Sequence, residues 1–130
     1  LLGSFSFEGQ KPVNDIPKYT GIADVLVGCL VKSELLEATI PAKVMSYIAA
    51  GKPIVLSMDG EAKELVEKQA KCGYVGPTED ANALALNIQK IIKMDSAERR
   101  AMGKRGKTFH ENHLSRDILL TKLYDFMFRE

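Results

Sequence analysis

Runs of apolar residues alternate along the chain with segments in which apolar positions recur at helical spacing. The runs predict short strands at residues 23–31, 53–57 and 73–75, and the stretch Ser4–Phe7 predicts another. The helical spacing predicts helices at residues 16–22, 41–50, 61–70, 80–93 and 97–111, and a last helix after Ser115. Gly51 is placed to end the second of these helices, and Asp95 with Glu98 forms a capping box before the fifth.

Strands that alternate with helices predict an α/β fold with a parallel sheet and right-handed crossovers. With about four strands, we expect an open, Rossmann-like, doubly wound sheet with a helical C-terminal end. The run at residues 23–31 is almost entirely apolar, which predicts a strand covered on both faces. Leu84, Ile88, Ile91 and Ile92 are expected to form one buried stripe of the helix at 80–93.

The composition of the chain narrows the classes of protein it can belong to. With 130 residues, 45% hydrophobic and 27% charged, it matches one ordinary globular domain. A net charge of +1 argues against a nucleic-acid binder that works through overall charge. No apolar run approaches the roughly 18 residues of a membrane span. Cys29 and Cys72 lack metal-site spacing, which favours a reducing, cytoplasmic compartment.

Charge is unevenly distributed between the two parts of the chain. Residues 1–89 carry eight basic and eleven acidic side chains (net −3), whereas residues 90–130 carry ten and six (net +4). Two explanations stay open at this point. The basic part is either a solvated helical surface or a surface that faces a membrane or an acidic partner.

Candidate chemistry is expected at the carboxyl ends of the strands, where open parallel sheets bind ligands. The helix beginning at Pro41 offers unpaired first-turn amides and Lys43, a combination that favours phosphate oxygens. The sequence has no P-loop, no G-x-G-x-x-G and no G-x-S-x-G motif. His110 and His113 fit surface or capping positions better than a zinc site, and Tyr47 fits a packing position.

A longer motif goes further than these single features. Residues 39–61, TIPAKVMSYIAAGKPIVLSMDGE, follow the pattern P-[SA]-K-x-x-x-Y-x-A-x-G-K-P-[IV]-[IVL] and then D-G-E. The flanks agree in order, with F-x-G at 7–9, I-P-K-Y at 16–19, A-D-V-L-V at 23–27, C-G-Y-V at 72–75 and A-M-G-K-R-G at 101–106. Together they resemble the donor-binding, C-terminal half of retaining glycosyltransferases with the GT-B fold. The resemblance is to the branch that builds bacterial surface polysaccharides of the colanic-acid and O-antigen type.

The resemblance implies a nucleoside diphosphate sugar as the substrate, a UDP-sugar above all, with no metal and no resident cofactor. The diphosphate would lie on the helix N-terminus, and the hexose would lie near the D-G-E turn. Residues near the first predicted strand would approach the base. The implied donor-binding residues are Gly9, Glu37, Thr39, Pro41, Lys43, Val44, Ser46, Gly60 and Glu61.

The chain departs from the broader family pattern at two glutamates that stand eight positions apart. Ala38 and Ser46 occupy those positions here, with Glu37 next to the first. Ser46 could make a weak hydrogen bond in place of the second. We therefore expect a changed contact to the ribose, without reading the change as a loss of activity.

The resemblance also implies parts that this chain does not contain. The Arg and Lys that neutralise the leaving diphosphate, and the acceptor-binding domain, are expected upstream. Residues 1–130 are thus expected to be a donor-binding fragment of a longer protein, incomplete at its N-terminus. The full-length protein would be cytoplasmic, touch the inner membrane face peripherally and bind no nucleic acid.

Two interpretations of the last helix stay open. The apolar residues of this helix either close the local core or dock on the missing domain, in which case the fragment would self-associate. They are Leu119, Leu120, Leu123, Phe126 and Met127.

Besides a transferase, the sequence allows a non-catalytic sugar-nucleotide-binding subunit that needs a partner chain. The third hypothesis is a related GT-B enzyme that epimerises the sugar.

Overall fold

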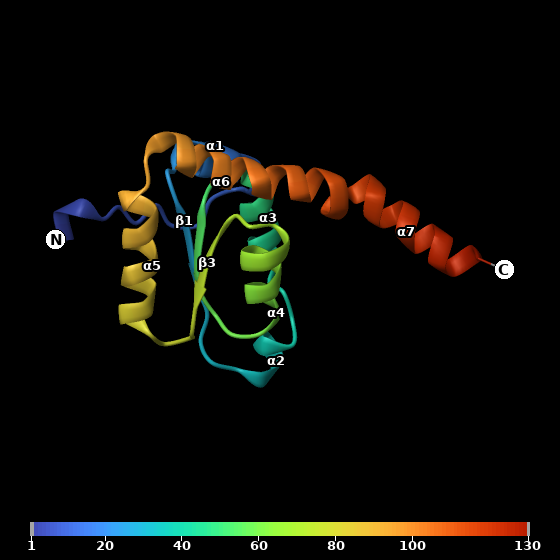
Figure 1. The fold of residues 1–130 in the computed structure, drawn as a ribbon, viewed down its shortest axis with the longest axis horizontal. Coiled ribbons are helices and arrows are strands. Elements are labelled where there is room, and N and C mark those ends of the chain that lie inside the picture. Colours follow the sequence, from blue (N-terminus) through green and yellow to red (C-terminus); the bar gives the residue numbers. More distant parts are fainter. Residues whose placement is uncertain (1, 130) are drawn as a thin grey trace.

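The computed structural model describes residues 2–129 and contains a three-stranded parallel sheet flanked by helices (Figure 1). Strands β1 (Leu26–Cys29), β2 (Ile54–Ser57) and β3 (Gly73–Gly76) lie in the order β1-β2-β3. Leu26 pairs with Ile54, and Ile54 pairs with Gly73. The predicted α/β class, with an open parallel sheet and a helical C-terminal end, is confirmed.

Helices cover both faces of the sheet and its amino edge (Figure 1). The α-helices are α1 (Ile16–Ile22), α2 (Glu34–Glu37), α3 (Ala42–Ala50), α4 (Glu61–Lys63), α5 (Ala81–Lys93), α6 (Ser96–Phe109) and α7 (Arg116–Phe128). Two of them continue as π-helical segments, α4 through η3 (Glu64–Gln69) and α6 through η4 (His110–Leu114). Short 3₁₀ turns form at η1 (Leu2–Ser4) and η2 (Val13–Asp15).

Two apolar clusters, one on each face of β2, hold these layers together. Because successive side chains of a strand point to opposite faces, Leu56 joins α3 and η3 on one side while Val55 meets α5 on the other. All four residues of β2 are buried, as expected of the central strand. The larger cluster includes Val44 and Ile48 of α3, both with no exposed surface.

Local capping signals place the helix ends where the sequence predicts them. Gly51 ends α3 in the left-handed conformation, with φ of 71°. The Asp80 carboxylate accepts a hydrogen bond from the amide of Ala83 at the start of α5. Asp95 and Glu98 form the predicted capping box of α6. Ser115 stands at the N-cap of α7, but its side chain makes no capping hydrogen bond.

Two strand predictions are wrong. Residues 4–7 form no strand: the 3₁₀ turn η1 is followed by irregular chain, with Phe7 93% exposed. Only three strands therefore form in the described chain. The 23–31 run holds the shorter β1, which is covered on one face only. Val27 and Cys29 are exposed, because α5 packs on β2 and β3.

The stripe predicted for α5 is also partly wrong. Ile91 is fully buried, but Ile92 is 62% exposed. Consecutive helical residues lie about 100° apart around the axis, so both cannot face the same layer.

Helix α7 extends away from the sheet and leaves its apolar residues exposed (Figure 1). It packs against the preceding π-helical segment, and none of its residues is buried. The exposed set comprises Leu119, Leu120, Leu123, Phe126 and Met127. These side chains do not close the local core, so the docking interpretation stays a prediction.

The exposure of α7 gives a direct expectation for self-association. Leu123→Lys combined with Phe126→Lys should leave the thermal midpoint of the chain nearly unchanged, since both side chains are more than half exposed. The same pair should reduce self-association, because two charges would be placed on the apolar surface. Sedimentation velocity and circular dichroism measure the two effects. Unfolding of the variant would instead assign this surface to the core.

Candidate functional site

The loops after the three strands lie together at one edge of the sheet, because parallel strands end on the same side. The ladder continues into these loops, since Leu30 N donates to Ser57 O and Met58 N donates to Gly76 O, each at 3.0 Å. The Ser57 hydroxyl donates to the carbonyl of Pro77 at 2.8 Å. These hydrogen bonds hold the residues that follow each strand in place at the carboxyl edge of the sheet.

Gly60 brings the turn after β2 against the end of α2. Its φ is 86°, and a Cβ placed there would lie 2.0 Å from the carbonyl oxygen of Glu37. Only glycine fits this approach. Glu37, the last residue of α2, therefore lies beside Gly60 and Glu61, the first residue of α4. The structure brings together these three predicted residues.

The first turn of α3 lies a short distance along the chain from this group. Pro41 is its N-cap, no side chain caps it, and the backbone amide of Val44 donates to Pro41 O at 2.9 Å. Pro41 follows Glu37 by four residues, a span of at most roughly 14 Å. The amides of Ala42 and Lys43 and the positive end of the helix dipole are available to an anion there.

Lys43 adds a cation to this helix start. The residue is exposed, and its Cδ lies 3.9 Å from the position that a Cβ on Gly28 would occupy. The missing side chain of Gly28 thus leaves room for the lysine stem over β1. Tyr47, one turn further, packs over the same glycine and donates its hydroxyl to Val27 O at 3.3 Å. Burial raises the pKa of that hydroxyl, which agrees with the predicted packing role.

The remaining predicted residues of this segment make contacts within the protein. The Thr39 hydroxyl donates to the carbonyl of Leu35 in α2, at 3.2 Å. The Ser46 hydroxyl donates to Ala42 O at 3.3 Å. Both oxygens keep lone pairs that can accept a hydrogen bond. The Val44 side chain is fully buried in the core, and its backbone amide already donates to Pro41 O.

Gly9 is not brought to this group. It is exposed, with φ of 68°, in the irregular segment before α1. That segment lies toward α1 rather than α2 (Figure 1). Since residues 4–7 form no strand, no carboxyl end delivers Gly9 to the site edge.

Three polar residues at this edge were missed by the sequence predictions. The Thr78 hydroxyl donates to the Asp59 carboxylate, which ties the turn after β2 to the turn after β3. Glu79, with φ of 61°, accepts a hydrogen bond from Lys32 N at 3.4 Å. Asp59 belongs to the D-G-E motif, but no spacing signal marks the other two.

The cleft between α2 and the sheet edge is small. It has no interior space large enough for a water molecule and is lined in part by Glu37, Asp59 and Thr78. Sites for small molecules usually measure 300 Å³ or more. A ligand of nucleotide size would therefore lie on the open side of this edge, along the first turn of α3.

Residues 2–129 also bear on metal binding, membrane crossing and the two histidines. Within that range, no group of three or more His, Cys, Asp or Glu side chains could hold a metal ion. The described helices are also too short or too polar to cross a membrane. His113 packs against Phe109, with ring centroids 4.7 Å apart, and both predicted surface histidines lie in the π-helical segment after α6.

Comparison with known proteins decides the family. The sequence pattern of the glycosyl transferases group 1 matches residues 1–109. The chain belongs to this family. The matched part of this group 1 chain contains the whole sheet and every predicted donor-binding residue, whereas α7 lies beyond it.

Two curated relatives of this group 1 chain carry the same name. The putative colanic acid biosynthesis glycosyltransferase WcaL of Escherichia coli (strain K12) is 28% identical over 116 residues, which cover 88% of this chain and 28% of the relative. Its counterpart in Salmonella typhimurium (strain LT2) is 28% identical over 116 residues, covering 85% and 28%. The chain thus spans little more than a quarter of these relatives. No solved structure matches it at a comparable level.

Proposed function

We propose that this group 1 chain is the donor-binding half of a retaining glycosyltransferase with the GT-B fold, acting in the synthesis of a surface polysaccharide. The substrate would be a nucleoside diphosphate sugar, a UDP-sugar above all. The observation that supports this proposal most strongly is the first turn of α3, which has no side-chain cap and includes Lys43. It lies at the edge that also holds Glu37, Gly60 and Glu61. The names of the two curated relatives support the polysaccharide assignment.

The diphosphate is the part of the donor for which this edge has the clearest chemistry. Backbone amides at a helix N-terminus bind phosphate oxygens, and the helix dipole favours their negative charge. Lys43 supplies a charge-assisted hydrogen bond from the same turn. No acidic residue occupies the first turn of α3, so this turn itself adds no repulsion to the anion.

The hexose would lie beside the start of α4. Glu61 is exposed there, and its carboxylate can accept hydrogen bonds from sugar hydroxyls. Glu37 approaches the same point from α2, because Gly60 allows the close contact between the two segments. This arrangement lets Glu37 take part in sugar binding although Ala38 stands at the family's glutamate position.

The two cysteines are consistent with a cytoplasmic location for the reaction. Both are free thiols, Cys29 exposed and Cys72 buried. Burial raises the pKa of the Cys72 thiol to about 11, so this group stays protonated and unreactive at neutral pH.

Lys43→Ala tests the phosphate contact. The variant should weaken UDP binding by roughly 1–2 kcal/mol, the scale of one charge-assisted hydrogen bond, which is about a tenfold rise in Kd. Isothermal titration calorimetry measures the change. Lys93→Ala, an exposed lysine at the end of α5, is the matched control and should leave Kd unchanged. Equal affinities of the Lys43 variant and the parent chain would remove Lys43 from the site.

Glu61→Gln separates sugar recognition from nucleotide recognition. The amide keeps the shape of the side chain but loses the charge and one acceptor oxygen. We therefore expect a larger loss of affinity for the UDP-sugar than for UDP, measured by the same calorimetry. If both ligands lost equal affinity, Glu61 would not contact the hexose.

A further inference from the structure

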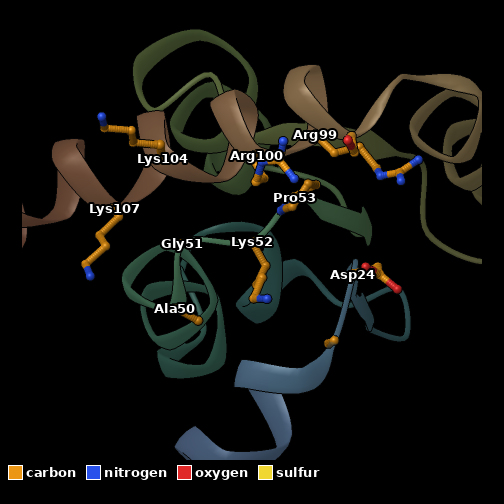
Figure 2. A pocket seen from close by; sticks show the side chains of 11 residues that line it. Asp24, Ala50, Gly51, Lys52, Pro53, Arg99, Arg100, Lys104 and Lys107 are labelled. Atoms are coloured by element: carbon orange, nitrogen blue, oxygen red, sulfur yellow. The ribbon is translucent and has the colours of Figure 1, made fainter.

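A cationic cleft opens at the amino end of the sheet, opposite to the edge described above. It has a volume of about 440 Å³ and lies between the end of α3, the turn into β2 and α6 (Figure 2). One carboxylate and five cationic side chains line this cationic cleft: Asp24, Lys52, Arg99, Arg100, Lys104 and Lys107.

Most of these cations have no partner within residues 2–129. No ion pair or side-chain hydrogen bond of the described chain involves Lys52, Arg100, Lys104 or Lys107. Arg99 differs, because its Nη1 donates to the carbonyls of Ile92 and Met94 at 3.2 and 2.8 Å. Its guanidinium is thereby fixed between the end of α5 and the cleft.

The helix that carries these side chains contains repulsive pairs. Arg100 and Lys104 stand four residues apart, and Lys104 and Lys107 stand three apart, so each pair lies on one face of α6. Like charges at these spacings destabilise a helix. Residues 99–110 include no acidic side chain that would offset them. A bound anion would provide the compensation that the helix itself lacks.

Close backbone packing fixes the spacing of these charges. A Cβ on Gly103 would lie 2.2 Å from the carbonyl oxygen of Gly51, so α6 rests directly on the end of α3. The Cβ of Lys107 lies 3.3 Å from the position that a Cβ on Gly51 would take. Lys52 follows this contact immediately. The cations are therefore held on a rigid frame, which lowers the entropic cost of binding a ligand.

We propose that the cationic cleft binds a phosphate group. Guanidinium and ammonium groups that line one hollow match a ligand with several oxygens and more than one negative charge. Two sources present this chemistry, a soluble phosphate compound and the head group of an anionic phospholipid. The site is separate from the proposed donor site, because the length of β2, roughly 13 Å, lies between them.

Lys52→Gln combined with Arg100→Gln is the test variant, because the two residues line the cleft from different elements, the turn into β2 and α6 (Figure 2). Lys93→Gln with Arg116→Gln removes the same charge types from exposed positions elsewhere and is the matched control. Both pairs are made in the Lys43→Ala background, so that the proposed diphosphate site does not contribute. Lys104→Gln provides a second, independent cleft variant.

Two probes distinguish the sources of phosphate. Inorganic phosphate is titrated while amide NMR shifts of residues 96–107 are followed, and vesicle co-sedimentation compares phosphatidylcholine with and without phosphatidic acid. Binding should fall with added salt, and the cleft pair should weaken it about tenfold while the control pair leaves it unchanged. Binding of vesicles alone assigns a lipid head group, and binding of phosphate alone assigns a soluble ligand. Binding of neither probe, or equal binding by the two variant pairs, would overturn the proposal.

Discussion

Gly103→Ala is expected to lower the free energy of unfolding by about 3 kcal/mol, at the upper end of what overpacking usually costs. The added methyl group would lie 2.2 Å from the carbonyl oxygen of Gly51. That neighbour is backbone, which cannot rotate away as a flexible side chain could. To relieve this clash, α6 would have to move away from the end of α3, and the packing around Met102 would be lost.

The expected loss of stability is opposite in sign to the usual effect of replacing a glycine by alanine in a helix, so the measurement is decisive. In a helix interior without close neighbours, replacing glycine by alanine stabilises a protein by up to about 1 kcal/mol. Gly21 in α1 is the matched control, because a Cβ there would meet nothing within 4 Å. Urea unfolding of both variants gives the comparison. A stabilised Gly103 variant would contradict the close helix contact on which the cationic cleft rests.

Features set by a few neighbouring residues could be predicted from the sequence. The end of α3 at Gly51 and the capping box of α6 depend on residues within one helical turn, and both are confirmed. The apolar run of β2 was likewise sufficient, because a central strand is buried whatever surrounds it. The predicted start of α3 at the carboxyl edge follows from strand order alone.

Features set by distant partners could not be predicted in this way. Residues 4–7, Ser-Phe-Ser-Phe, suit a strand in composition, but a strand forms only where a neighbour offers its backbone, and none does so in residues 2–129. The approach of Gly60 to Glu37 joins segments that the sequence separates by more than twenty residues. The cationic cleft has the same origin. The basic surplus of residues 90–130 was visible, but its meeting with Lys52 depends on how α6 packs.

The group 1 chain by itself is expected to transfer no sugar, even with a bound donor. This expectation rests on the proposed function. Transfer requires an acceptor held against the reacting carbon and cations that stabilise the leaving diphosphate. The resemblance implies that both come from chain beyond these residues, and the curated relatives are more than three times as long.

The measurement incubates the chain with a radiolabelled UDP-sugar and a lipid-linked or oligosaccharide acceptor, then follows the glycoside product. A chain extended to the full length of its relatives, or mixed with a separate acceptor-binding chain, is the positive control. Restoration by a separate chain would favour the two-chain arrangement over a single longer enzyme. Release of free sugar alone would not count as transfer, since water needs no acceptor site. Formation of a glycoside by residues 1–130 would show that the catalytic groups lie within this chain, and Lys43 and Glu61 would then be the first to replace.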